Sequence, residues 1–71
     1  MFKKIAVIGL GLMGGSLAAA CRKCFPGARI VGITRNPTAL ALAKKKKWIH
    51  EGTRDIALGA AGADVVVLCT P

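Results

Sequence analysis

The stretch that decides the fold is residues 3–14, KKIAVIGLGLMG, in which an apolar run is followed directly by spaced glycines. The run at residues 3–8 shows no alternation of apolar and polar side chains, which is typical of a strand covered on both faces. Gly9, Gly11 and Gly14 then fit the pattern G-x-G-x-x-G. Because these glycines follow a strand and open a predicted helix, they indicate a phosphate-binding turn more than a glycine-rich turn without a ligand.

Each position of this turn has a physical task. Gly9 lets the chain turn sharply out of the strand, Gly11 lets the backbone approach a pyrophosphate, and Gly14 lets the helix pack closely on the strand. The N–H groups of Leu12 and Met13 fall at the helix N-terminus, where unpaired donors and the helix dipole favour an anion. The predicted pyrophosphate site comprises Gly9, Leu10, Gly11, Leu12, Met13 and Gly14.

The rest of the chain continues the alternation of strands and helices. Further strands are predicted at residues 29–34, 48–51 and 63–69, and helices at about residues 12–24, from residue 36 onward, and at residues 55–61. Asn36 and Pro37 suit the N-cap and first position of a helix, and Lys44 to Lys47 suit its negative end. This order predicts an α/β fold, a Rossmann-like parallel sheet of about four strands with right-handed crossover helices, incomplete as it stands.

Composition limits the classes of function. The chain has 71 residues, fewer than the ~100–200 of a usual domain. Hydrophobic residues make up 54% and mean hydropathy is +0.53, which excludes a disordered chain and exceeds what so small a domain readily buries. The net charge of +8 suggests a phosphate ligand or a polyanionic partner. Three cysteines form no disulfide framework, so we expect a cytoplasmic protein.

The uncharged run from Ile5 to Cys21 has a basic start and resembles a signal peptide or a membrane span. Four glycines interrupt it, which weakens any helical core, and its 17 residues are at the short limit for a span. We therefore expect no membrane partner.

The end of the second predicted strand determines which dinucleotide is expected. In NAD-binding units an acidic residue about 20 residues beyond the glycines binds the ribose hydroxyls. Here no acid lies between Ala28 and Ala43, and the strand ends in Thr34, Arg35 and Asn36. A hydroxyl and a guanidinium suit a 2′-phosphate, so we predict that NADP is preferred to NAD. The alternative is that Arg35 is a solvated loop residue.

Other patterns favour ordinary structural roles. Cys21 and Cys24 form C-x-x-C, but both fall on the predicted apolar helix face and no second pair completes a metal site, so we predict core packing and no metal. The run Lys44–Lys47 has few aromatic residues to accompany it, which argues against nucleic acid as a partner. His50 has no catalytic partner nearby in the sequence. Asp64 is expected to be a turn or cap residue.

Residues 5–18, IAVIGLGLMGGSLA, resemble the start of prephenate and arogenate dehydrogenases, the oxidoreductases that complete tyrosine biosynthesis. Supporting matches are VGITRNP at residues 31–37 and ADVVVLCTP at residues 63–71. The resemblance covers essentially the whole chain, but only the front half of the family's nucleotide domain. It implies that residues 9–14 hold the pyrophosphate of NADP or NAD and that residues 34–36 hold the adenosine ribose or its phosphate.

The resemblance also implies that Cys69, Thr70 and Pro71 line the path toward the nicotinamide. Lys47 stands where the family commonly has a helix-ending glycine, so we expect a strained or differently shaped turn there. The family's catalytic His, its substrate-binding basic residues and its helical dimerisation domain come later in the chain. We therefore expect residues 1–71 to be the N-terminal half of a dinucleotide-binding domain, homodimeric when full length, with no catalytic residue and no turnover of its own.

In the family reaction, oxidative decarboxylation, hydride passes from the cyclohexadienyl ring to the nicotinamide while carbon dioxide leaves. Two other functions stay open from the sequence. One is a related NADP-dependent reductase or hydroxyacid dehydrogenase, and the other is a non-catalytic nucleotide-binding module.

Overall fold

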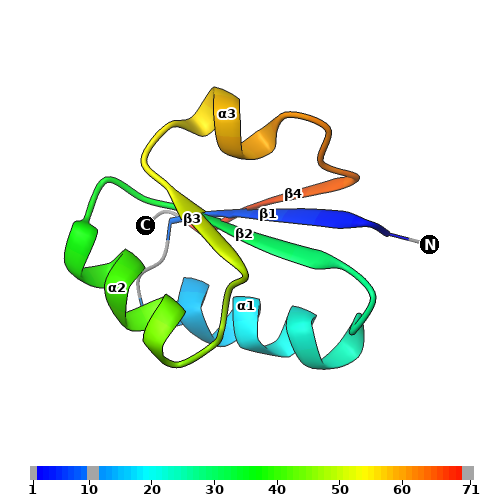
Figure 1. Ribbon diagram of the computed structural model, residues 1–71, viewed down its shortest axis with the longest axis horizontal. Coiled ribbons are helices and arrows are strands. Elements are labelled where there is room, and N and C mark those ends of the chain that lie inside the picture. Colours follow the sequence, from blue (N-terminus) through cyan, green and yellow to red (C-terminus); the bar gives the residue numbers. More distant parts are fainter. Residues whose placement is uncertain (1, 10–11, 70–71) are drawn as a thin grey trace.

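The computed structural model describes residues 2–9 and 12–69 and, at residues 12–14, only the helical backbone. Strands and helices alternate along the chain (Figure 1): β1 Lys4–Ile8, α1 Leu12–Cys24, β2 Arg29–Ile33, α2 Pro37–Lys45, β3 Glu51–Thr53, α3 Ile56–Ala60 and β4 Val65–Leu68. All three strand pairings are parallel, in the order β3-β2-β1-β4. The predicted Rossmann-like sheet is confirmed.

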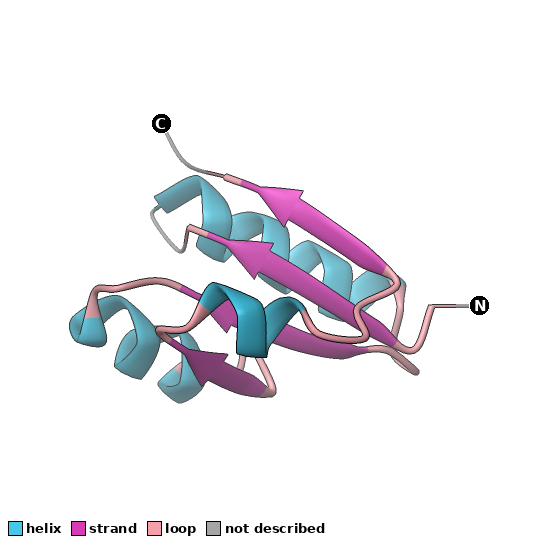
Figure 2. Cartoon of the chain, turned by 90° about the horizontal axis from the view of Figure 1, so that it is seen from above, coloured by secondary structure: helices cyan, strands magenta, loops and turns pink. Residues whose placement is uncertain are grey.

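The sheet separates two layers of helices. α1 and α2 lie on one face and α3 lies on the other (Figures 1 and 2). Successive side chains of β1 point to opposite faces of the sheet. Ile5 and Val7 belong to one buried cluster, and Ala6 belongs to the other, with Val31 and Ile33. Since both clusters need apolar side chains, the strand carries no polar alternation.

β3 lies further along the chain than residues 48–51, where the sequence predicted it. It spans Glu51–Thr53. Trp48 and Ile49, whose aromatic and β-branched side chains suggested a strand, pack instead against the core between the sheet and α1. Trp48 fits there because Gly15 of α1 has no side chain, and a Cβ at that glycine would lie 2.9 Å from Cζ3 of the indole. Tertiary packing has outweighed strand propensity.

Cys24 departs from the predicted apolar face of α1. Cys21 contacts the core, but Cys24 is exposed. Three residues turn a helix by about 60° less than a full turn. Cys24 is therefore rotated away from Cys21, out of the buried stripe. The prediction that both thiols pack in the core was therefore wrong for Cys24.

α2 begins as the sequence predicted. The side-chain oxygen of Asn36 accepts hydrogen bonds from the N–H groups of Thr38 and Ala39, at 2.9 and 3.3 Å, and Pro37 occupies the first turn. After the helix, Lys47 adopts φ +61°, a region that favours glycine. The unusual turn expected at Lys47 is confirmed.

The uncharged run from Ile5 to Cys21 is divided between β1, the glycine turn and α1. Among the described residues, no helix combines the length and the apolar character that crossing a bilayer requires. Apolar side chains are instead exposed on the α3 face. Val66 and Leu68 of β4 are level with Ala6 and Ile8 of β1 on that face, and they are 47% and 72% exposed, because α3 packs mainly on β1, β2 and β3.

Candidate dinucleotide-binding site

The carboxyl ends of the parallel strands meet at one edge of the sheet. Gly9 follows β1, Thr34 follows β2, Arg54 follows β3 and Cys69 follows β4. β2 and β4 lie on opposite sides of β1, so the strand order reverses at β1. In open α/β sheets, ligands bind outside the carboxyl ends at such a switch point.

The turn after β1 has the backbone geometry that the glycine pattern predicts at its first position. Gly9 adopts φ +90°, which a residue with a Cβ rarely adopts. Its N–H donates a hydrogen bond of 2.7 Å to the carbonyl oxygen of Ile33, which joins the turn to the end of β2. α1 begins at Leu12, and the first N–H groups of a helix have no partner within the helix. A helix N-terminus therefore lies three residues after Gly9, beside the switch point.

The predicted pyrophosphate site is described only in part. Leu10 and Gly11 lie outside the described residues, and Leu12, Met13 and Gly14 are described only as helical backbone. The tasks predicted for Gly11 and Gly14 stay predictions.

A cavity of about 450 Å³ opens at the same edge, on the face that α3 covers. Its lining residues come from the ends of β1 and β2 and from the start of α3: Ile8, Gly9, Ile33, Thr34, Arg35, Arg54, Asp55, Ile56 and Ala57. The structure thus brings Thr34 and Arg35, predicted from the sequence, beside Gly9. Apolar residues line the cavity together with three charged ones, Arg35, Arg54 and Asp55, a combination suited to a ligand with both apolar and charged parts.

Thr34 is held in place by its neighbours on both sides. Its N–H donates to the carbonyl oxygen of Thr53 at 3.1 Å, and its Oγ1 accepts a hydrogen bond from the N–H of Asn36 at 3.3 Å. Asn36 was predicted to contact the ribose or its phosphate, but it is not part of the cavity lining. Its side-chain oxygen is occupied as the N-cap of α2.

Arg54 and Asp55 also line the cavity, although the sequence does not predict them as site residues. The sequence predicts the strand at residues 48–51, so neither residue directly follows a predicted strand end. Asp55 is the N-cap of α3, because its Oδ1 accepts a hydrogen bond of 3.0 Å from the N–H of Leu58. A predicted strand that ended at Thr53 would have placed Arg54 and Asp55 directly after a strand end.

Of residues 69–71, which follow β4, Cys69 is the one that the structure describes. The N–H of Cys69 donates to the carbonyl oxygen of Ile8 at 2.8 Å, and its side chain packs against the core. Thr70 and Pro71 lie outside the described residues. A role for these three residues on the nicotinamide side stays a prediction.

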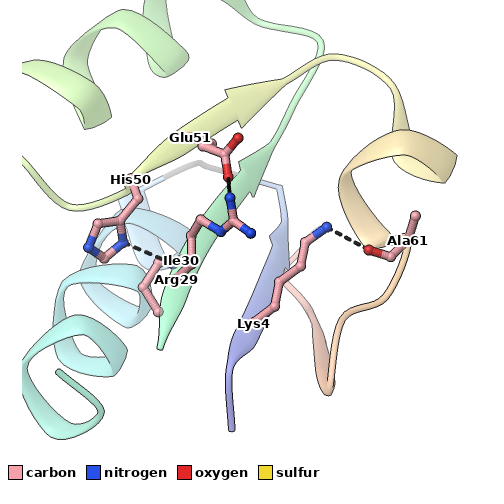
Figure 3. A network of polar contacts seen from close by, with 6 residues as sticks. All are labelled: Lys4, Arg29, Ile30, His50, Glu51 and Ala61. Carbon is pink, nitrogen blue, oxygen red and sulfur yellow. Dashed lines mark hydrogen bonds and ion pairs between the residues drawn. The ribbon is translucent and has the colours of Figure 1, made fainter. Parts of the chain in front are cut away.

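His50, for which the sequence predicts no catalytic role, has a structural partner (Figure 3). Nδ1 of His50 accepts a hydrogen bond of 2.9 Å from the N–H of Ile30. Burial, and then the positive charges of Arg22 and Arg29, hold the pKa of the imidazole below its usual value. An ion pair of 2.9 Å joins Arg29 to Glu51. These contacts fasten β2 to the segment around β3, away from the glycine turn.

Asp64 fastens β4 to β1. Its Oδ2 accepts hydrogen bonds from the N–H groups of Lys3 and Lys4, at 2.7 and 2.9 Å, and these donors lower the pKa of the carboxyl. Nζ of Lys4 donates to the carbonyl oxygen of Ala61 at 2.6 Å (Figure 3). Asp64 is therefore a turn residue, as predicted, rather than an acid catalyst.

Burial, reinforced by the nearby thiols of Cys24 and Cys69, raises the pKa of the Cys21 thiol. A thiol with a raised pKa is a poor nucleophile at neutral pH. Within residues 2–9 and 12–69, no three His, Cys, Asp or Glu residues come together as a metal ion would require.

Comparison with known proteins gives a consistent result. Residues 4–71 match the family model described as "NADP oxidoreductase coenzyme F420-dependent". The prephenate dehydrogenase of Lactococcus lactis subsp. cremoris (strain MG1363) is 35% identical over 69 residues, 97% of this chain and 19% of that protein. The prephenate dehydrogenase of Bacillus subtilis (strain 168) is 37% identical over 67 residues, 94% of this chain and 18% of that protein. The chain spans about a fifth of the length of these curated relatives.

Two solved structures share the fold. Arogenate dehydrogenase from Synechocystis superposes with a TM-score of 0.84 at 35% identity, over 96% of this chain and 23% of that one. Prephenate dehydrogenase from A. aeolicus, in complex with hydroxyphenyl propionate and NAD+, superposes with a TM-score of 0.88 at 32% identity, over 100% of this chain and 25% of that one.

Proposed function

Because the chain belongs to the family described as coenzyme F420-dependent NADP oxidoreductases, we propose that it binds a dinucleotide at the carboxyl edge of its sheet. The observation that carries the proposal is that Gly9, Thr34 and Arg35 line one cavity at the switch point of the strand order. The pyrophosphate is held by residues 9–14 and the adenosine ribose by Thr34 and Arg35, with residues 69–71 on the nicotinamide side. Asn36 supports this site by capping α2.

NADP is the preferred dinucleotide in this proposal. A 2′-phosphate needs cationic donors, and the cavity offers the guanidinium groups of Arg35 and Arg54. No carboxylate follows β2, where NAD-binding units place one. Asp55 also lines the cavity, and its Oδ1 accepts a hydrogen bond from the N–H of Leu58, so its single negative charge offsets only one of the two arginines. The A. aeolicus structure contains NAD+, so the proposed preference for NADP rests on the residues of this chain and not on that relative.

We propose further that the chain forms the N-terminal half of the nucleotide domain of a prephenate or arogenate dehydrogenase. Its curated relatives are prephenate dehydrogenases about five times its length. The exposed Val66 and Leu68 of β4 lie where the next strands and helices of a larger sheet would cover them. In that larger protein, a cytoplasmic homodimer, hydride passes from the cyclohexadienyl ring to the nicotinamide as carbon dioxide leaves. The acid–base group comes from outside residues 1–71.

A second candidate is a related NADP-dependent reductase, which the description of the matched family favours. It shares the cofactor site but reduces a different substrate. The two functions differ in the segment that follows the nucleotide domain, so the substrate assay below separates them.

The test is to express the whole reading frame that contains residues 1–71 and to follow reduction of the nicotinamide with prephenate and with arogenate. The proposal predicts that one of the two substrates supports reduction of NADP+ faster than of NAD+. Turnover of neither substrate, with dinucleotide binding retained, would favour the reductase.

A further inference from the structure

Building on the proposed function, we propose that Arg54 is a specificity-determining residue, whose guanidinium binds the 2′-phosphate of NADP jointly with Arg35. Arg54 lies in the connection from β3 to α3, on a different strand end from Arg35. The two residues line the same cavity of about 450 Å³.

The parallel register brings the two strand ends together. Ile33 of β2 is paired with Thr53 of β3, and the pairing continues by one more hydrogen bond, from the N–H of Thr34 to the carbonyl oxygen of Thr53. Arg35 and Arg54 are therefore the first cationic residues beyond two adjacent paired strands. Both are exposed, which leaves their guanidinium groups accessible to a ligand in the cavity.

The carboxylates of the chain are engaged with other groups. The chain has three acidic residues: Glu51 pairs with Arg29, Asp64 accepts from the backbone at the start of β1, and Asp55 caps α3. Within the described part of the chain, neither Arg35 nor Arg54 forms an ion pair with any of them. The cavity is therefore lined by two cationic residues and by one carboxylate, that of Asp55, which stays charged while it caps α3.

A phosphomonoester supplies negative charge to this pair of arginines beyond that of Asp55. Its charge is about −1.5 to −2 at neutral pH, and it presents three acceptor oxygens. Each guanidinium offers a planar fork of donors that matches two of those oxygens. One arginine binds a phosphate on one side only, whereas two arginines from adjacent strand ends reach it from two directions. NAD, which has a hydroxyl at this position, gains little from the second arginine.

The test is isothermal titration, with NADP+ and NAD+, of the protein expressed from the whole reading frame that contains residues 1–71 and of its Arg35→Ala, Arg54→Ala and Arg54→Lys variants. Lys23→Ala, which removes one positive charge at the far end of α1, is the matched control. We expect Arg54→Ala to weaken NADP+ binding about tenfold or more, the scale of a lost hydrogen bond to a charged group. NAD+ binding should change by less than about twofold, because it lacks that group.

Arg54→Lys should lie between the wild type and Arg54→Ala, because an ammonium keeps the charge and loses the fork of donors. Circular dichroism of each variant confirms that the fold is retained. Equal loss of NADP+ and NAD+ binding in Arg54→Ala, or no loss of either, would overturn the role of Arg54 and leave the proposed function standing. A wild-type chain that binds neither dinucleotide would overturn both.

Discussion

The guanidinium of Arg22, in the last turn of α1, donates a hydrogen bond to the carbonyl oxygen of Lys47, the residue with φ +61°. This hydrogen bond connects the end of α1 to the turn that follows α2. The turn places Trp48 against Gly15 of α1. An energetically unfavourable backbone conformation is thus retained at Lys47 because the groups around it fit together.

Replacing Lys47 with glycine should stabilise the protein. A Cβ in the left-handed region costs about 1–2 kcal/mol, and part of that gain is offset by the greater freedom of glycine in the unfolded chain. We expect Lys47→Gly to raise the free energy of unfolding by about 0.5–1 kcal/mol in urea titrations. Lys46, with φ −80°, is the control. Lys46→Gly should be destabilising, and a gain in stability for both variants would contradict the explanation.

Asn36→Ala should lower stability because it removes the N-cap of α2. The variant leaves the N–H groups of Thr38 and Ala39 without their side-chain acceptor. The expected loss is about 1 kcal/mol in the free energy of unfolding. Asn36→Ser retains an acceptor oxygen and should lose only part of this. Full stability in Asn36→Ala, together with lost dinucleotide binding, would instead assign the residue to the cofactor site.

Gly59→Ala should be destabilising because α3 lies very close to the sheet. A Cβ at Gly59 would lie 2.6 Å from Cδ1 of Ile33 and 2.7 Å from Cγ2 of Thr53. Making room for it should cost about 1–3 kcal/mol of unfolding free energy. Gly27→Ala is the matched control, since nothing lies within 4 Å of its Cβ. Similar behaviour of the two variants in thermal unfolding would show that α3 does not pack as described.

Stability should fall on mild acidification because of His50. Its pKa is held below the ordinary 6.5 in the folded state, so the unfolded chain takes up the proton first as pH decreases. The free energy of unfolding should therefore have its full value above the pKa of His50 in the unfolded chain. It should decrease as the pH falls from there to the pKa of His50 in the folded state. His50 is the only histidine. Unfolding measured at about pH 7.5 and about pH 5.5 should show this decline in the wild type and a smaller one in His50→Gln.

The first part of the fold could be predicted because its signals are local. An unbroken apolar run, a glycine pattern and a helix follow one another at residues 3–24, and Asn36 with Pro37 marks the next helix start. The prediction that failed, the position of β3, depends on tertiary packing. Trp48 carries a strand-like signal but fills the space above Gly15, and that displaced the predicted β3.

The displaced strand also explains what was missed at the site. Thr34 and Arg35 could be predicted because they follow a clear strand at a known distance from the glycines. Arg54 and Asp55 join them only through the pairing of β2 with β3, a relationship between segments about 20 residues apart that no local pattern records.

The carboxyl edge of this sheet is proposed to bind a dinucleotide and to recognise its 2′-phosphate through Arg35. Titration of wild type and Arg35→Ala with NADP+ and NAD+ by calorimetry tests it most directly. We predict tighter binding of NADP+ by the wild type, and a loss of about tenfold or more in NADP+ affinity in Arg35→Ala, with NAD+ little changed. Tighter binding of NAD+, or unchanged NADP+ affinity in Arg35→Ala, would contradict the specificity, and no binding of either dinucleotide would contradict the site itself.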